Sequence, residues 1–137
     1  MALFDWDSGK YSVYIDEMDT HHKKLMSLIN SIYDASKNPP NKASNTKLFD
    51  EIINYTLMHF ETEEKIMEKM GFPDIKTHKF IHKDLVSKVV KFREEYDKGP
   101  GAYKPEFVNF LKVWLTAHIQ GIDRKYGEYS KTHKSAA

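Results

Sequence analysis

The sequence contains no cysteine, and this absence limits the chemistry that the chain can support. Disulfide frameworks, zinc sites built from thiolates and iron–sulfur clusters all require cysteine, so they are excluded. Any metal ion must therefore be bound through nitrogen and oxygen atoms.

An excess of charge of one sign is also missing. The 21 basic and 20 acidic side chains give a formal net charge of +1. Proteins that bind nucleic acid usually concentrate basic residues on one face, whereas the lysines here are scattered among acidic residues. We therefore expect no nucleic-acid partner.

Long apolar segments are absent as well. No stretch approaches the roughly 18 consecutive apolar residues that a membrane-spanning helix needs. The first residues, Met1 to Asp7, carry acidic side chains where a secretory signal would need basic ones. We expect no membrane partner and a cytoplasmic location.

What is present is a helical pattern. The 137 residues, 40% of them hydrophobic, suit a single domain with one core, over residues 1–137. Apolar residues recur at helical spacing in four segments, separated by breaks that contain proline or glycine. We predict helices from about Asp19 to Ala35, from Ser44 to Met70, from Asp74 to about Lys98, and from Pro105 onward.

The fold class follows from these segments. Four helices with short connections bury their apolar stripes most economically as an all-α, antiparallel up-down four-helix bundle. We predict an ordered, non-helical arm over about residues 1–15 and a frayed tail over about 132–137. Asp19 or Thr20 is expected to cap the first helix and Asp74 the third, and Pro105 suits the first turn of the fourth.

Each predicted helix places polar residues on its apolar stripe. In chain order they are His22, His59, Glu63, His78, His82 and His118, with Asp123 nearby. A lone histidine in such a place is more often a hydrogen-bonded core residue than a ligand. Here, however, five of the seven histidines converge from four helices, and burying two carboxylates without a cation would cost several kcal/mol. The pattern therefore predicts a shared metal site.

The residue types narrow the choice of metal. Structural zinc sites use about four ligands, so seven overfill one zinc. No Glu-x-x-His occurs, which argues against a carboxylate-rich di-iron site. Two octahedral ions held by five imidazoles, two bridging carboxylates and a bridging oxo or hydroxo group would keep one position open, and imidazole is a suitable ligand for iron. Such a site suits a small neutral ligand.

At this point the chain resembles the hemerythrins, especially the single-domain bacterial ones. The motifs that carry the resemblance are Asp19-x-x-His22, His59-Phe-Glu-Thr-Glu63, His78-x-x-x-His82, and His118-x-x-x-x-Asp123 followed by Tyr126. The resemblance implies two non-haem iron ions joined by an oxo or hydroxo bridge. It also implies reversible binding of molecular oxygen.

The resemblance also assigns individual roles. It implies that His78, His82 and His118 bind one iron and that His22 and His59 bind the other. Glu63 and Asp123 would then bridge the two ions. The residues that match the oxygen pocket of the family are Phe60, Trp114, Leu115 and Ile119.

Two departures from the family pattern are visible. His21 stands where the family often has glutamine, and it cannot face the core together with His22 because neighbours on a helix lie about 100° apart. Secondly, the family often has proline between the last histidine and the aspartate. In a regular helix His118 and Asp123 would diverge by about 140°, so we expect a local distortion, with Gly121 as the residue that allows it.

The expected function is oxygen storage, transport or delivery, with molecular oxygen and a protein that receives it as partners. Alternatives are a sensory module that signals to a partner, a di-iron enzyme that reduces nitric oxide or peroxide, and a metal-free structural bundle. No acid–base residue dedicated to turnover is recognisable, so an enzyme is not expected.

Overall fold

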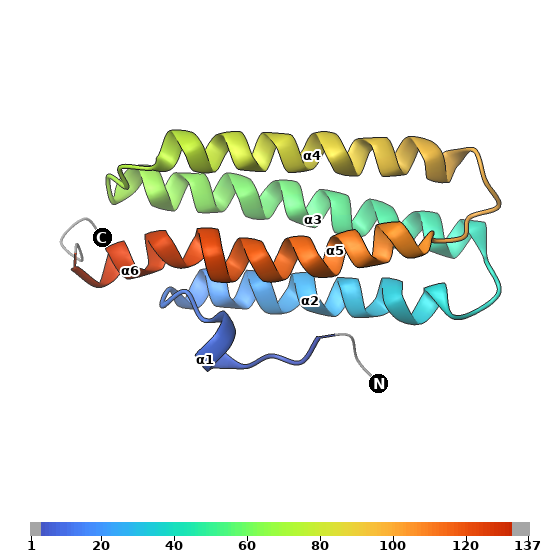
Figure 1. The fold of residues 1–137 in the computed structure, drawn as a ribbon, viewed down its shortest axis with the longest axis horizontal. Coiled ribbons are helices and arrows are strands. Elements are labelled where there is room, and N and C mark those ends of the chain that lie inside the picture. The colour runs from blue at the N-terminus through green and yellow to red at the C-terminus, as the bar shows by residue number, and fades with distance from the viewer. Residues whose placement is uncertain (1–3, 133–137) are drawn as a thin grey trace.

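Four long helices lie side by side and alternate in direction along the chain (Figure 1). A computed structural model describes residues 4–132. The elements are α1 (Ser8–Tyr11), α2 (Asp16–Ser36), α3 (Lys42–Lys69), α4 (Ile75–Asp97), α5 (Pro105–Ala117), η1 (His118–Asp123) and α6 (Arg124–Thr132). The last three form one continuous helical rod. The predicted antiparallel four-helix bundle is thereby confirmed.

The ends of the helices follow local signals, with one exception. The Asn41 side chain accepts a hydrogen bond from the Ser44 amide at 3.1 Å and caps α3. Pro105 occupies the first turn of α5, as predicted. Asp74 stands at the N-cap position of α4, but its side chain makes no capping hydrogen bond, so that part of the prediction is wrong.

The start of α2 also differs from the prediction. The helix begins at Asp16, and neither Asp19 nor Thr20 caps it. The Asp19 carboxylate instead accepts hydrogen bonds from the Val13 amide at 2.8 Å and the Ser12 hydroxyl at 2.7 Å. These contacts with the arm compete for the side chain that would otherwise cap the helix, so Asp19 ties the arm to the bundle.

The described part of the N-terminal arm contains the single helical turn α1, so the prediction of a non-helical arm is wrong. The Asp7 carboxylate stabilises this turn by accepting a hydrogen bond from the Gly9 amide at 2.9 Å. The arm then packs on α6, where a Cβ at Gly127 would overlap the Val13 carbonyl. Thr132, the first residue of the predicted frayed tail, is the last residue of α6, and residues 133–137 lie outside the described part.

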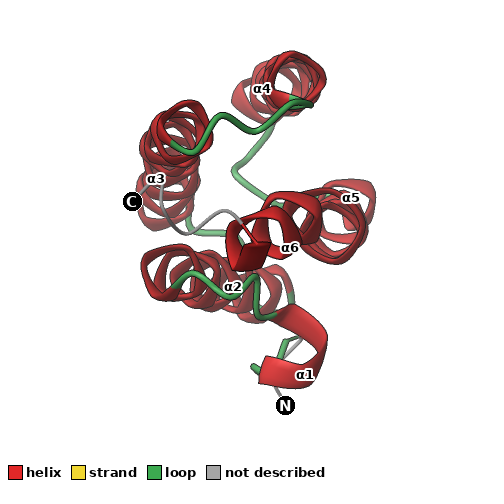
Figure 2. Cartoon of the chain, turned by 90° about the vertical axis from the view of Figure 1, so that its left-hand side faces the viewer, coloured by secondary structure: helices red, strands yellow, loops and turns green. Residues whose placement is uncertain are grey.

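The apolar core extends along the bundle between α2, α3 and α5. Figure 2 shows α4 on the side of α3 and α5 that is opposite α2. The Phe49 ring of α3 stacks on the Phe107 ring of α5, with ring centroids 4.6 Å apart. Within residues 4–132, no helix has both the length and the apolar character needed to cross a membrane. Buried polar residues of the interior form the candidate site.

Candidate metal centre

All seven predicted site residues lie together inside the bundle. Each is at most 4% exposed to solvent. α2 supplies His22, α3 supplies His59 and Glu63, α4 supplies His78 and His82, and η1 supplies His118 and Asp123. Every helix therefore contributes at least one imidazole to a single polar centre.

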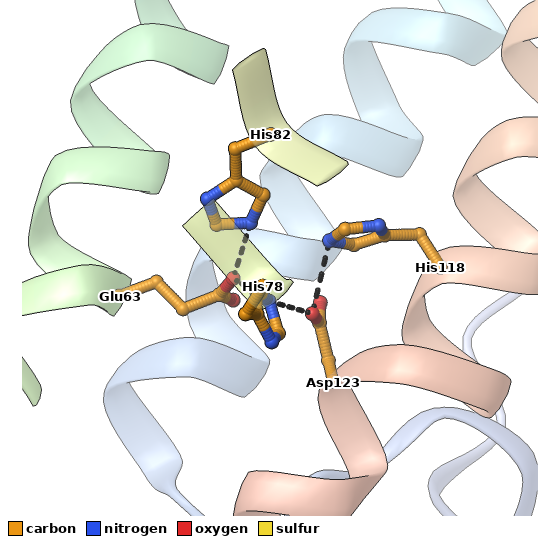
Figure 3. A group of neighbouring side chains, drawn as sticks. All are labelled: Glu63, His78, His82, His118 and Asp123. Atoms are coloured by element: carbon orange, nitrogen blue, oxygen red, sulfur yellow. Dashed lines mark hydrogen bonds and ion pairs between the residues drawn. The ribbon is translucent and has the colours of Figure 1, made fainter. Parts of the chain in front are cut away.

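The residues form two groups that share both carboxylates. One group consists of Glu63, His78, His82, His118 and Asp123, and Figure 3 shows these five side chains pointing toward one another. The other consists of His22, His59, Glu63 and Asp123. Within each group, the nitrogen and oxygen atoms that could bind a cation lie within 4.8 Å of one another.

Glu63 faces each group with a different oxygen atom. Its Oε1 lies 3.0 Å from Nε2 of His78 and 2.9 Å from Nε2 of His82. Its Oε2 lies 3.2 Å from Nε2 of His59 and 3.7 Å from Nε2 of His22. This is the arrangement that a bridging carboxylate requires.

Asp123 repeats the arrangement from the opposite side of the centre. Its Oδ1 lies 3.0 Å from Nε2 of both His78 and His118, and its Oδ2 lies 3.1 Å from Nε2 of His22. The two carboxylates therefore join the three-histidine group (His78, His82, His118) to the two-histidine group (His22, His59).

A segment of π-helix turns Asp123 inward. η1 spans His118–Asp123, and its wider i→i+5 hydrogen-bond pattern brings residues five apart to the same side. The predicted local distortion is thus present. Nothing at Gly121 requires glycine, however, because a Cβ there would meet no atom within 4 Å and its backbone is not left-handed.

Several polar atoms at the centre are buried without a hydrogen bond. They are Nδ1 and Nε2 of His22, Nε2 of His82 and His118, and both carboxylate oxygens of Asp123. Such atoms usually cost about 1–3 kcal/mol each unless they find a partner. A pair of cations would provide that partner, and a donor set of imidazoles and carboxylates fits iron among the transition metals.

The charges at the centre depend strongly on one another. Burial disfavours the protonated form of His22 and His78, but the adjacent carboxylates of Asp123 and Glu63 outweigh it and raise the pKa of each histidine to about 9. Burial likewise favours neutral carboxyls, yet the surrounding histidines hold the pKa of Glu63 and Asp123 well below the usual range. Without metal, protons therefore take the place of cations.

Three further residues support the ligand set from outside. The Tyr126 hydroxyl, fully buried, donates a hydrogen bond to Glu63 Oε2 at 2.7 Å. Nδ1 of His59 lies 2.9 Å from Nδ1 of His21, and Nδ1 of His82 lies 2.9 Å from Oε2 of Glu64. Burial and the neighbouring His59 lower the pKa of His21, which favours its neutral form.

Only part of this outer layer could be predicted from the sequence. Helix geometry predicted that His21 does not face the core together with His22, and Tyr126 belonged to a matching motif but had no predicted role. The spacing of Tyr126, three residues after Asp123 on the same helical face, was a usable signal. No sequence signal marked Glu64, because its partner His82 lies on another helix.

Of the four residues predicted to line an oxygen pocket, Phe60 and Trp114 lie against histidines of the centre. The Phe60 ring stacks on the His82 imidazole at 3.7 Å, and the Trp114 ring lies 5.7 Å from that of His118. Leu115 and Ile119 are at most 1% exposed and belong to the main core. An apolar cavity of about 40 Å³ lies between α3, α4 and α5, and of these four residues Trp114 lines it.

The comparison with known families agrees with this geometry. Residues 13–129 match the model of the hemerythrin HHE cation binding domain. The chain belongs to the hemerythrin family. The chain is therefore a hemerythrin-like cation-binding domain, and it contains a buried cluster of histidine and carboxylate side chains that could hold metal ions.

Relatives match this hemerythrin-family chain over most of its length. Bacteriohemerythrin of Methylococcus capsulatus is 29% identical over 127 residues, which cover 93% of this chain and 96% of that protein. Bacteriohemerythrin of Stenotrophomonas maltophilia is 30% identical over 133 residues, covering 97% and 85%. A solved structure of wild-type hemerythrin matches with a TM-score of 0.86 at 28% identity, covering 93% of this chain and 97% of that one.

Proposed function

We propose that this chain binds molecular oxygen reversibly at two iron ions, for oxygen storage, transport or delivery to a partner protein. The observation that carries the proposal is the unequal division of the seven buried residues. The three-histidine group offers five ligand residues, whereas the two-histidine group offers four, and both counts include the shared carboxylates. If two octahedral ions also shared one bridging oxygen, the ion at the two-histidine group would have a position left for a small ligand.

The chain's own residues have distinct roles in this proposal. His78, His82 and His118 would hold one ion, His22 and His59 would hold the other, and Glu63 and Asp123 would supply a carboxylate oxygen to each ion. Two ferrous ions would supply the two electrons that this kind of oxygen binding needs. Tyr126 holds Glu63 by donating to Oε2, the oxygen that faces the two-histidine group.

Apolar side chains complete the proposed site. Phe60, Trp114, Leu115 and Ile119 would exclude water and anions from the open position, which favours reversible binding over oxidation of the metal. The polar side chains of the centre are all used to bind the ions or to hold the ligands. We therefore assign the chain a binding role and no catalytic turnover, in keeping with its bacteriohemerythrin relatives.

A spectroscopic experiment tests the proposal. The protein is loaded with iron, its metal content is measured, and its absorption is followed through repeated reduction and exposure to air. We expect two irons per chain, no haem, and a coloured oxygenated form that disappears when oxygen is removed. A single bound zinc would refute the metal assignment. Steady consumption of peroxide or nitric oxide would show an enzyme instead.

A further inference from the structure

Two of the metal-facing histidines are held from behind by side chains of different charge. The outer nitrogen of His82, Nδ1, contacts the Glu64 carboxylate at 2.9 Å. The outer nitrogen of His59, also Nδ1, contacts the His21 imidazole at 2.9 Å. One of these histidines belongs to the three-histidine group and the other to the two-histidine group.

The direction of each hydrogen bond follows from the metal-facing atom. A histidine that binds a cation through Nε2 carries its proton on Nδ1 and donates it outward. His82 then donates to an anion, which increases the electron density on its metal-facing nitrogen. His59 donates to Nδ1 of His21, which must be unprotonated to accept and so adds no charge.

The surroundings of the two outer partners agree with these roles. His82 lies between two adjacent carboxylates of α3, with Glu63 Oε1 at 2.9 Å from Nε2 and Glu64 Oε2 at 2.9 Å from Nδ1. The Glu64 side chain is 27% exposed, so solvent reaches this carboxylate while it contacts His82. His21 is half-buried on α2, and its ring meets the Tyr55 ring edge-on.

We propose that Glu64 and His21 are positioning residues that make the two metal positions unequal. Glu64 adds negative charge behind the three-histidine group, whereas His21 holds the two-histidine group with a neutral acceptor. The ion at the three-histidine group is therefore bound more tightly and favours its more highly charged state. This inference rests on the two-metal centre proposed above.

Cobalt binding tests the Glu64 part without oxygen chemistry. The variant Glu64→Gln keeps a hydrogen-bond acceptor but loses the charge, and Glu64→Ala loses both. The matched control is Glu61→Gln on the same helix, because the Glu61 side chain is 70% exposed and pairs with Lys65 at 3.1 Å. We measure Co2+ affinity by competition with a chelator and follow the visible spectrum of each bound ion.

We expect the wild type to bind two Co2+ per chain. Glu64→Ala should weaken one of them about 10- to 100-fold, the range typical for loss of a carboxylate behind a ligand histidine. Glu64→Gln should weaken the same ion less, and Glu61→Gln should weaken neither. Equal weakening of both ions, or equal effects of Glu61→Gln and Glu64→Gln, would overturn the inference.

The His21 part needs its own pair of variants. His21→Leu removes the acceptor, whereas His21→Gln retains one. His21→Leu should weaken binding of the other Co2+ ion, the one whose affinity Glu64→Ala leaves unchanged. His21→Gln should bind that ion about as tightly as the wild type does. Because the two residues act on different ions, their effects should add in the double variant. Weakening of the same ion by both substitutions would refute the assignment.

The reduction potential of the iron-loaded protein distinguishes the effect of the Glu64 charge from the effect of a hydrogen bond alone. Glu64→Gln should make the potential more positive, because a negative charge that favours oxidised iron is lost, while His21→Gln should leave it unchanged. The cobalt result also separates this inference from the proposed function. Unequal cobalt sites without reversible oxygen binding would refute the function alone, and reversible oxygen binding with unchanged variants would refute the inference alone.

Discussion

The helices α2 and α4 both contribute histidines to the buried polar centre, yet they bury very different amounts of apolar surface. α2 buries seven side chains, six of them apolar, and its single buried histidine is His22. α4 is longer but buries four, and two of these are His78 and His82. Because burial of apolar surface is the main stabilising contribution, we expect α2 to pack without metal and the docking of α4 to depend more strongly on the centre.

The largest expected effect comes from removing the metal. Loaded protein should be more stable than metal-free protein by at least about 4 kcal/mol when free metal exceeds the dissociation constant 1,000-fold. The loss should concentrate on α4, whose amides should exchange with deuterium much faster in the metal-free form. Hydrogen exchange resolved by residue measures this, with α2 as the internal control. Equal loss of protection in both helices would remove the proposed distinction.

The next effect is a dependence of the metal-free protein on pH. The pKa of His22 and His78 is about 9 in the fold against about 6.5 in the unfolded chain. Their stabilisation is therefore fully present below pH 6.5 and is lost as the pH rises to about 9, on the order of 3 kcal/mol for each. Urea unfolding at pH 6 and pH 9 measures the loss.

Metal-loaded protein is the control for this prediction, because its histidines must already be neutral to bind. Its stability should not fall over the same pH range. The variant His78→Gln should also remove roughly half of the pH dependence of the metal-free form. A metal-free protein equally stable at pH 6 and pH 9 would show that the histidines do not share protons with the carboxylates.

A core substitution in α2 should act independently of metal. Ile29 is fully buried, so Ile29→Ala should cost about 2–5 kcal/mol in both the loaded and the metal-free form. Iron content should stay at the wild-type level. Val113→Ala, at a position that is 56% exposed, should change stability by less than about 0.5 kcal/mol. Chemical denaturation of all three proteins checks this, and a cost that appears only without metal would contradict it.

The smallest effect concerns the N-terminal arm. Gly127→Ala should cost about 1–3 kcal/mol, because the new Cβ overlaps the Val13 carbonyl and pushes the arm away from α6. Gly121→Ala is the matched control, since a Cβ there meets nothing. It should be neutral or stabilising by up to about 1 kcal/mol. Thermal melting distinguishes them, and equal melting temperatures would show that the arm does not need this close approach.

The local sequence pattern predicted structure correctly where residues of a single helix decide where that helix lies and ends. Apolar spacing located four helices, and Pro105 and Gly71 marked helix ends because each has a backbone preference of its own. The local sequence pattern predicted the start of α2 and its capping residue incorrectly. The Asp19 side chain could cap its own helix or bind the arm, and the competing contact comes from residues that local spacing does not connect to it.

The amino-acid sequence by itself determined which residues converge, because a polar side chain on an apolar stripe must point into the bundle. Only the tertiary structure decided how they share the centre. The two oxygens of Glu63 and of Asp123 face different histidines, and η1 turns Asp123 inward. Glu64 and His21 acquire their partners in the same way, since each contact joins two helices whose relative rotation and offset are set by packing of the whole bundle.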